Sequence, residues 1–235
     1  MAKGRHRLNE ASVANATLFT ADAGGTLVLY NKSGVTLTGV SSSPSPIEGS
    51  RSMQLTYPTA FDGAYITNGL YGYGWVDYFI YMPTACPYIF VDFINHDLDD
   101  AGVLFSWTSI HSDGSTHVEF YYGGFGETYI DRAWSPAGTV PKNEWVRVRS
   151  YSPGTASRID VFKGSNLYGT TPDSSISAYD IDLSGYPPLS CGIWMNSANS
   201  VNGTYYIDDY MQTDAGEPPA RTTAYGPSIR RQLPY

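Results

Sequence analysis

The chain has 235 residues, which is enough for two small domains or for one large β-sandwich with a sizeable core. Its 20 Tyr, 9 Phe, 5 Trp, 24 Gly and 15 Pro favour strands and turns, because aromatic residues suit a pleated sheet while Gly and Pro interrupt helices. The formal charge of -8 argues against nonspecific nucleic-acid binding, and no apolar run resembles a membrane span or a secretory signal.

Apolar side chains alternate along the chain with a period of two rather than the 3.6-residue period of a helix. Asp113-Gly114 and Lys163-Gly164 follow apolar runs and are typical of β-hairpin turns. With no convincing helix, the sequence predicts an all-β, two-sheet antiparallel sandwich. The predicted strands are residues 26–30, 34–40, 52–57, 63–67, 74–81, 88–95, 102–110, 116–122, 127–132, 145–151, 157–163, 191–196 and 204–213.

The two ends of the chain differ in charge from its middle. Residues 1–14 and 215–235 together hold six basic and two acidic side chains, a net +4, which leaves -12 for the remainder. Basic arms on an acidic body can dock onto acidic neighbours, so we expect other assembly proteins, including copies of the same chain in a homo-oligomer, as partners. Solvated, disordered ends are the alternative.

Cys86 and Cys191 are the only cysteines, and each leads into an apolar strand. We predict that they are small buried hydrophobic side chains rather than a disulfide framework. A single bridge between them is left open by the sequence.

Four short segments match a known order of strand motifs. They are Gly-Ser-Arg-Ser-Met-Gln-Leu at 49–55, Trp145 with Val146 and Val148, Val161-Phe-Lys-Gly164, and Ile207-Asp-Asp209. In this order they resemble a laminin G-like, or concanavalin A-like, β-sandwich. The resemblance implies a jelly roll at residues 15–214 with extended basic arms at 1–14 and 215–235. In this general organisation, a sandwich with basic arms, the chain also resembles minor tail or capsid-associated virion proteins of phages that infect actinobacteria.

The motif for sugar cleavage in this fold is missing. Glucanases of the fold carry Glu-x-Asp-x-Glu on one strand, because a period of two places the outer carboxylates on one face. None of the six Glu residues has an Asp two positions on, and the Arg, Gln-x-His and Tyr clusters of the fold's lyases are not found. We therefore expect no catalysis; the alternative is a pair drawn from Asp77, Asp92 and Glu119 on separate strands.

Glycan binding is the more plausible activity. Aromatic rings stack on the apolar faces of sugars while carboxylates accept hydrogen bonds from hydroxyls. Trp134 lies in a predicted loop and is the best candidate for an exposed ring, whereas Trp75 and Trp107 in central strands could instead be core residues. The candidate ligand-binding residues are Trp134, Trp75, Asp77, Trp107, Asp92 and Glu119.

The sequence offers two possible metal sites, and each has a metal-free alternative. Related carbohydrate-binding sandwiches place a structural calcium beside the closing strand, which suggests Asp208, Asp209 and Asp22 as ligands. A carboxylate satisfied by Tyr or by backbone amides is the alternative, and no other cofactor is expected. His111 and His117 flank Gly114 symmetrically and could share zinc, or could be paired surface imidazoles.

Two classes of function follow. The first is a non-catalytic structural and adhesive virion protein, made in the host cytoplasm, whose sandwich binds a host glycan or a neighbouring virion protein. The second is a carbohydrate-active enzyme, a glycoside hydrolase or polysaccharide lyase, or a free lectin of the same fold.

Overall fold

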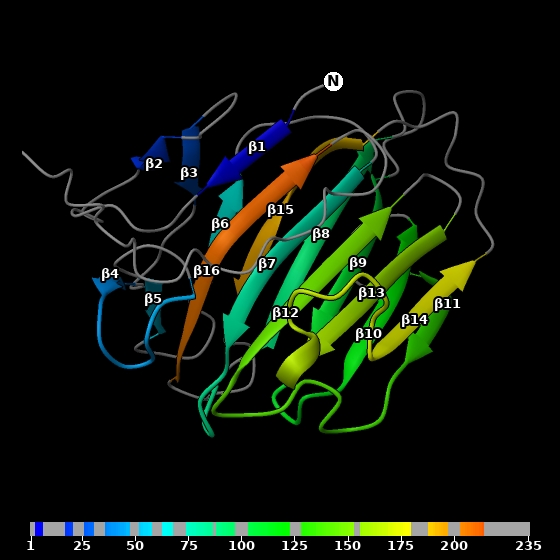
Figure 1. Ribbon diagram of the computed structural model, residues 1–235. Helices are drawn as coiled ribbons and strands as arrows, with labels where there is room; N and C mark the ends of the chain where they lie inside the picture. The colour runs from blue at the N-terminus through cyan, green and yellow to red at the C-terminus, as the bar shows by residue number, and fades with distance from the viewer. Residues whose placement is uncertain are drawn as a thin grey trace, which may run out of the picture.

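In the computed structural model the chain forms two antiparallel β-sheets that pack face to face (Figure 1). This confirms the predicted two-sheet sandwich. The first sheet runs in the order β14 (Ser174–Tyr179), β13 (Ala156–Lys163), β12 (Trp145–Ser152), β7 (Gly74–Tyr81), β16 (Gly203–Thr213), β5 (Ser52–Tyr57) and β4 (Thr36–Val40), with β1 (Lys3–His6) also paired to β16. The second runs in the order β11 (Thr128–Trp134), β10 (Thr116–Tyr122), β9 (Val103–Ile110), β8 (Tyr88–His96), β15 (Pro188–Asn196), β6 (Gly63–Thr67), β3 (Thr26–Tyr30) and β2 (Thr17–Thr20).

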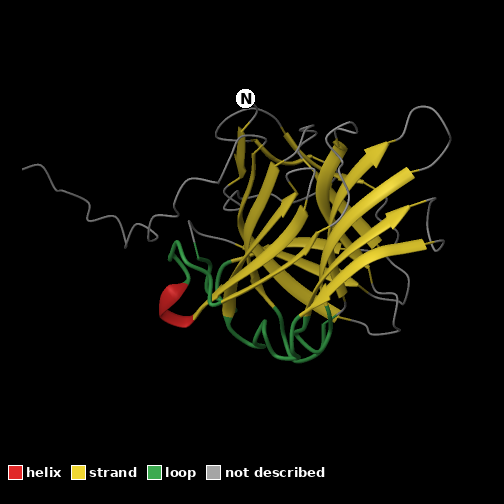
Figure 2. Cartoon of the chain, turned by 90° about the vertical axis from the view of Figure 1, so that its right-hand side faces the viewer, coloured by secondary structure: helices red, strands yellow, loops and turns green. Residues whose placement is uncertain are grey.

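The structure describes the backbone of residues 3–6, 17–20, 26–30, 36–47, 52–57, 63–67, 74–86, 88–96, 103–122, 128–152, 156–179, 188–196 and 203–213. It describes the side chains of residues 38–47, 52–56, 75–86, 108–118, 133–151, 157–178 and 203–211. In these ranges a single 3-10 turn, η1 (Gly164–Asn166), is the one helical element (Figure 2). No helix of the described segments has the length and apolarity to cross a membrane.

Most strand predictions agree closely with the structure. Strands β3, β5, β6, β7 and β10 have the predicted bounds, and the other predicted strands differ by no more than three residues at either end. The sequence analysis missed β1, β2 and β14, which are short or polar: four residues each in β1 and β2, and Ser-Ser-Ile-Ser-Ala-Tyr in β14. Because β2 and β14 lie at sheet edges and each pairs with one neighbour, they need little apolar patterning of their own.

The N-terminal segment contributes to the sandwich. Residues 3–6, part of the predicted arm at 1–14, form β1 and pair antiparallel with β16, Arg5 lying opposite Met211. The rest of this segment and residues 215–235 lie outside the described residues, so the domain boundaries stay a prediction.

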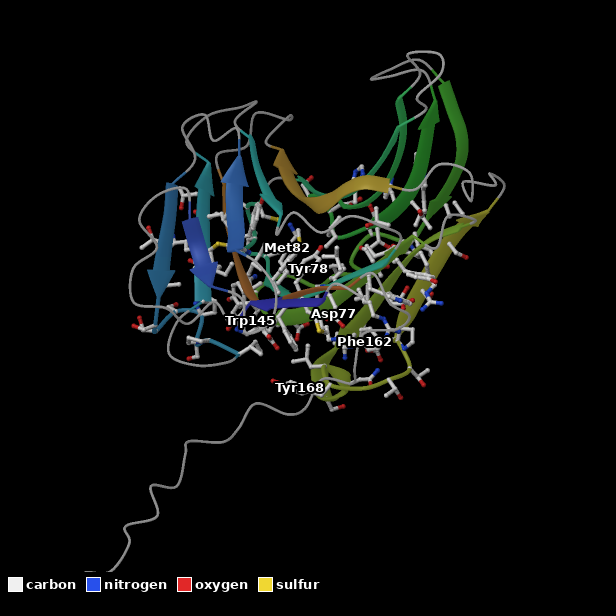
Figure 3. The ribbon with its side chains drawn as sticks, turned by 90° about the horizontal axis from the view of Figure 1, so that it is seen from above. Asp77, Tyr78, Met82, Trp145, Phe162 and Tyr168 are labelled. Carbon is white, nitrogen blue, oxygen red and sulfur yellow. The ribbon has the colours of Figure 1, made fainter. Side chains whose placement is uncertain are left out.

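The core lies between the two sheets. A hydrogen bond of 2.7 Å joins Thr108 Oγ1 on β9 to Ser150 Oγ on β12, and both side chains are buried, so these residues mark the facing sides of the sheets. Because side chains alternate along a strand, Val146 and Val148 share the side of Ser150, and Figure 3 shows Tyr78 and Met82 between the sheets. The apolar side chains of this layer in β7, β12 and β13 are at most 1% exposed: Val76, Tyr78, Ile80, Val146, Val148, Ile159 and Val161.

The opposite side of the first sheet is also buried, and an ion pair lies at its centre. Arg147 donates from Nε and Nη2 to Asp77, with Nη2 2.9 Å from Oδ2, and these residues are 1% and 0% exposed. Arg147 Nη1 donates to the carbonyl of Gly169 at 3.0 Å, so the loop after η1 covers the pair. In the same loop, Tyr168 lies with its ring centroid 5.6 Å from that of Phe79 (Figure 3).

A second ionic cluster extends this layer toward β14. Asp160 Oδ2 accepts hydrogen bonds from Arg149 at 2.9 Å and Arg158 at 3.1 Å, and Oδ1 accepts one from Ser175 Oγ at 2.7 Å. Both guanidinium groups lie over the ring of Trp75, at 4.7 Å and 4.9 Å from its centroid. The first sheet is therefore packed on both sides, apolar toward the second sheet and ionic and aromatic away from it.

Both predicted turns join consecutive antiparallel strands. At Asp113-Gly114, Gly114 N donates to His111 O and His111 N donates to Ser115 O, each at 2.9 Å. Gly114 has φ 81°, and a Cβ there would lie 2.3 Å from the carbonyl oxygen of Val140, so only glycine fits. At Lys163-Gly164 the connection to β14 is longer than predicted, because η1 begins at Gly164.

Cys86 is buried, as predicted, and it is unbridged, a point that the sequence had left open. Lys142 Nζ lies 3.0 Å from its sulfur, and burial is the largest effect on the pKa of the Cys86 thiol, which is raised. Cys191 lies in β15, and its side chain is outside the described residues.

Arg147→Met is expected to lower the free energy of unfolding by about 3–5 kcal/mol, because the buried Asp77 carboxylate would lose the guanidinium group of Arg147. Arg158→Met is the matched control: the Arg158 side chain is 35% exposed, so its loss should cost about 1 kcal/mol or less. Urea unfolding measures both. Equal losses in the two variants would contradict the assignment of Asp77 and Arg147 as a buried, mutually dependent pair.

Candidate functional site

The second sheet has a side that turns away from the first sheet. Thr108, Ile110 and Val118 are buried on its inner side, Thr108 through its hydrogen bond to Ser150. Residues of the opposite parity on β8, β9, β10 and β11 therefore belong to the outer face. We call this side the outer face of the second sheet.

A charged row crosses this outer face. In the strand registers Asp92 lies opposite Trp107, Trp107 opposite Glu119, and Glu119 opposite Arg132, on the adjacent strands β8, β9, β10 and β11. Gly192 on β15 continues the row beside Asp92. Three predicted ligand-binding residues, on three strands that follow one another in the chain, are thus register partners.

Trp134 lies on the same face, at the end of β11. It is 60% exposed and is the one exposed large hydrophobic side chain among those described. Its register partner is His117 on β10, two residues before Glu119. The Trp134 and His117 rings stack with centroids 4.5 Å apart and an interplanar angle of 22°. The prediction that Trp134 offers an exposed ring agrees with this geometry, while its role in binding stays a proposal.

A second imidazole ring and two hydrogen-bonded side chains hold this ring pair in place. His111 stacks on His117 with centroids 3.6 Å apart and an interplanar angle of 12°. His117 Nε2 lies 3.0 Å from Ser115 Oγ, which donates to Asp113 Oδ1 at 2.7 Å. Burial, together with the nearby His117, lowers the pKa of His111 from 6.5 to about 4. His111 is therefore neutral near pH 7.

This stacked geometry does not suit the zinc site considered for the two histidines. Imidazole nitrogens coordinate a metal in the plane of the ring, at about 2.0–2.1 Å. The planes of His111 and His117 are nearly parallel, so their lone pairs run side by side and do not converge on one ion. Paired imidazoles that support Trp134 describe this pair better.

Trp75 and Asp77 lie elsewhere, on the far side of the first sheet. Trp75 is 3% exposed and stacks on Tyr151 with ring centroids 3.9 Å apart, and the Asp77 carboxylate is held by Arg147. The two residues are two positions apart on β7 and share the side of the ionic layer, which the loop after η1 covers. Neither side chain is placed to meet a ligand together with the exposed ring of Trp134.

The closing strand holds Asp208 by backbone amides. Asp208 Oδ2 accepts from Ile47 N at 2.7 Å and Oδ1 accepts from Asp209 N at 2.8 Å, and the pairing of β16 with β7 is irregular between Asp208 and Met211. Asp209 has φ 41°, as the irregularity requires. This is the backbone-satisfied carboxylate that was the alternative to calcium.

No group of three or more His, Cys, Asp or Glu that could hold a metal occurs in the described part of the chain. Asp208 and Asp209 alone do not make a calcium ligand set, because such a site needs six to eight oxygens. Asp22 lies outside the described residues, so a calcium site that includes it stays a prediction.

Comparison with known proteins identifies the fold but no family. No family model and no curated protein matches the sequence. A protein of unknown function with a galectin-like fold from Bacillus subtilis aligns over 91% of this chain and 96% of its own, at 11% identity and a TM-score of 0.52. Arcelin-5, a lectin-like defense protein from Phaseolus vulgaris, covers 90% and 98% at 8% identity and a TM-score of 0.49. The β-glucanase of Bacillus licheniformis covers 90% and 97% at 11% identity and a TM-score of 0.49. The chain is a galectin-like, concanavalin A-like β-sandwich.

His111→Gln is expected to flatten the pH dependence of stability between about pH 6.5 and pH 4. The folded state keeps His111 neutral down to about pH 4, whereas the unfolded chain takes up the proton near pH 6.5. The unfolded state therefore binds more protons in this window, and stability falls as the pH falls. Urea unfolding of both proteins at pH 7.5, 6 and 4.5 measures the difference, and parallel pH profiles would contradict the burial of His111 in the stack.

Proposed function

We propose that this chain is a non-catalytic, glycan-binding virion protein, whose sandwich contacts a host-surface glycan through the outer face of the second sheet. The observation that carries the proposal is the row of Asp92, Trp107, Glu119 and Arg132 across four neighbouring strands, beside the exposed Trp134. Sugars require this mixture, because an aromatic ring covers their apolar face and charged groups take their hydroxyls.

The position of this row on a sheet favours a binding role. Regular strands place register partners at spacings of about 4.8 Å across the sheet, so the backbone positions of the row repeat on a rigid framework. Beside this row, the Trp134 ring stacks on His117, which in turn stacks on His111, and this reduces the rotamer freedom that Trp134 would lose on binding. The site is therefore supported by strands and stacked rings rather than by loops alone.

An enzyme of the same fold is the second candidate, and the same row favours it. Asp92 on β8 and Glu119 on β10 are separated by β9, which carries Trp107. Their backbones therefore lie about 9.6 Å apart. In hydrolases the two carboxyl groups lie about 6.5–9.5 Å apart for inversion and about 5–5.5 Å apart for retention, so this wide backbone spacing is closer to the inverting arrangement. New reducing ends released from a polysaccharide, and their loss in Glu119→Gln, would establish this alternative in place of the non-catalytic function.

The proposed assembly role rests on charge. The terminal segments carry a net +4 against -12 for the remainder, so residues 1–14 and 215–235 can dock onto acidic surfaces of virion neighbours or of other copies. Residues 3–6 already pair with β16, so removing the whole N-terminal segment would also remove a strand. The C-terminal segment is therefore the one to remove in a test of the assembly role.

Trp134→Ala is expected to weaken glycan binding at least tenfold, since exposed aromatic anchors carry a large share of binding energy. Affinity electrophoresis through β-glucan, alginate and actinobacterial cell-wall polysaccharide measures the effect. Tyr206→Ala is the control, because Tyr206 is a partly exposed aromatic residue on the first sheet. Equal retardation of Trp134→Ala and the unmodified chain would remove Trp134 from the site.

A variant that ends at Asp214 is expected to lose self-assembly while keeping its fold. The full chain should elute above its monomer mass of 25.7 kDa in size-exclusion chromatography with light scattering, and the shortened chain should elute as a monomer. Higher salt should lower the mass measured for the full chain toward that of the monomer, because screening weakens the docking of basic arms. Identical masses for the two chains would contradict the assembly role.

A further inference from the structure

A cysteine and a lysine are in contact at one end of the sandwich, apart from the row of Asp92, Trp107 and Glu119. Lys142 Nζ lies 3.0 Å from Cys86 Sγ. The same amine donates to the carbonyl oxygens of Thr84 and Ser112, and both of these contacts lie at the surface. Cys86 itself is 1% exposed and carries a free thiol. The sulfur is therefore covered by protein and touches an amine that reaches the surface.

Backbone hydrogen bonds on both sides of the lysine hold this contact in place. Val140 N donates to Gly114 O, and Asn143 N donates to Met82 O, each at 2.8 Å. The first bond joins the lysine segment to the hairpin between β9 and β10. The second joins it to the segment that leads from β7 to the cysteine. The contact between nitrogen and sulfur is thus set by three chain segments and not by the flexible lysine side chain alone.

The lysine also changes the chemistry of the thiol. Burial is the largest effect on the pKa of Cys86 and raises it, whereas the hydrogen bond and the positive charge of Lys142 act in the opposite direction. The thiolate is the form that reacts with oxidants, so Lys142 favours the reactive form at a position where burial opposes it. Reacting atoms about 3–3.5 Å apart are already positioned for attack, and the nitrogen and the sulfur meet this condition.

We propose that Cys86 and Lys142 form a reversible covalent cross-link when the protein is oxidised by a peroxide. In the first step the Cys86 thiolate attacks one peroxide oxygen and the O–O bond breaks. The sulfur is oxidised to a sulfenic acid, S–OH, and the peroxide is reduced to water or to an alcohol. This step involves only the sulfur and the peroxide.

The second step joins the two side chains without a further oxidant. The Lys142 ammonium releases a proton to solvent, and the nitrogen lone pair attacks the sulfur of the sulfenic acid. The S–N bond forms, the S–O bond breaks, and the departing hydroxide takes up a proton from the nitrogen and leaves as water. Two molecules of a thiol reductant reverse the link: they return the free thiol and the free amine and are themselves oxidised to a disulfide.

The link would make stability depend on oxidation. It joins positions 56 residues apart in the sequence. A covalent bridge across a long loop removes conformational entropy from the unfolded chain, as a disulfide does. The oxidised protein is therefore expected to unfold at a higher urea concentration than the reduced protein.

Mass spectrometry of the full chain, before and after hydrogen peroxide, tests the link directly. Trypsin cuts the free protein after Arg51, Arg132, Lys142 and Arg147, so the cysteine and the lysine fall in separate peptides. In the linked protein, cleavage after Lys142 is expected to be lost. Residues 52–132 should then be joined to residues 133–147, with two hydrogen atoms fewer than the two peptides together. A thiol reductant should separate them again.

Lys142→Arg is the matched control. Its guanidinium group keeps the positive charge and the hydrogen-bond donors, but it stays protonated and does not attack the sulfur. This variant is expected to form no link with peroxide. Because it has the same methionines as the unmodified chain, it also corrects the urea midpoint for methionine oxidation. After peroxide, the midpoint of the unmodified chain should rise relative to that of Lys142→Arg.

Each outcome decides the inference. A second peroxide can insert one oxygen atom between sulfur and nitrogen and release water, so joined peptides that carry one extra oxygen support the link as well. Cleavage that persists after Lys142, with Cys86 found as a sulfinic acid, in a disulfide or as an unchanged thiol, would overturn it. The peptide measurement on the unmodified chain is decisive even if Lys142→Arg does not fold. Glycan binding and assembly do not enter this measurement, so its result is independent of the proposed function.

Discussion

Burial of both sides of β7 determines which sheet of this protein can meet a ligand. Toward the second sheet, β7 packs Val76, Tyr78 and Ile80 into the core; on its other side, Asp77 is held by Arg147 under the loop that follows η1. An isolated buried carboxylate would be costly, and the two-pronged hydrogen bonding of Arg147 offsets that cost. The centre of the first sheet is covered in this way, and the register partners Asp92, Trp107, Glu119 and Arg132 lie on the other sheet.

Strand register decides which residues of the second sheet become neighbours in the candidate site. Adjacent strands β8, β9, β10 and β11 come from one continuous part of the chain, yet β15 joins them from much later in the sequence and β6 from earlier. Because partners in register share a face, three strand pairings align Asp92 with Arg132. The hairpin at Asp113-Gly114 sets the pairing of β9 with β10, so one glycine with positive φ helps to place Trp107 opposite Glu119.

Particular residues show how far the sequence could predict this arrangement. Asp92, Trp107 and Glu119 were selected for strand position and chemistry, and the register places them together; Trp134 was selected for its loop setting, and it is exposed. Trp75 and Asp77 were selected by the same reasoning and lie in the buried ionic layer. A period of two shows which residues share a side of a strand, but it does not show which side is covered. His117 and Arg132 were missed as neighbours of Trp134 and Glu119, because cross-strand partners depend on register.

The sequence by itself determined the class of fold and most strand bounds, since alternation and turn residues are local properties that each segment carries independently. It also determined that the glucanase motif is missing, which is a matter of spacing along one strand. Only the tertiary structure decided that Asp208 is satisfied by the amides of Ile47 and Asp209, that Asp77 is buried against Arg147, and that Asp92 lies on the strand next to Trp107. Those outcomes depend on which strands become neighbours, and pairing between distant segments is decided by the packing of the whole sandwich rather than by any one stretch of residues.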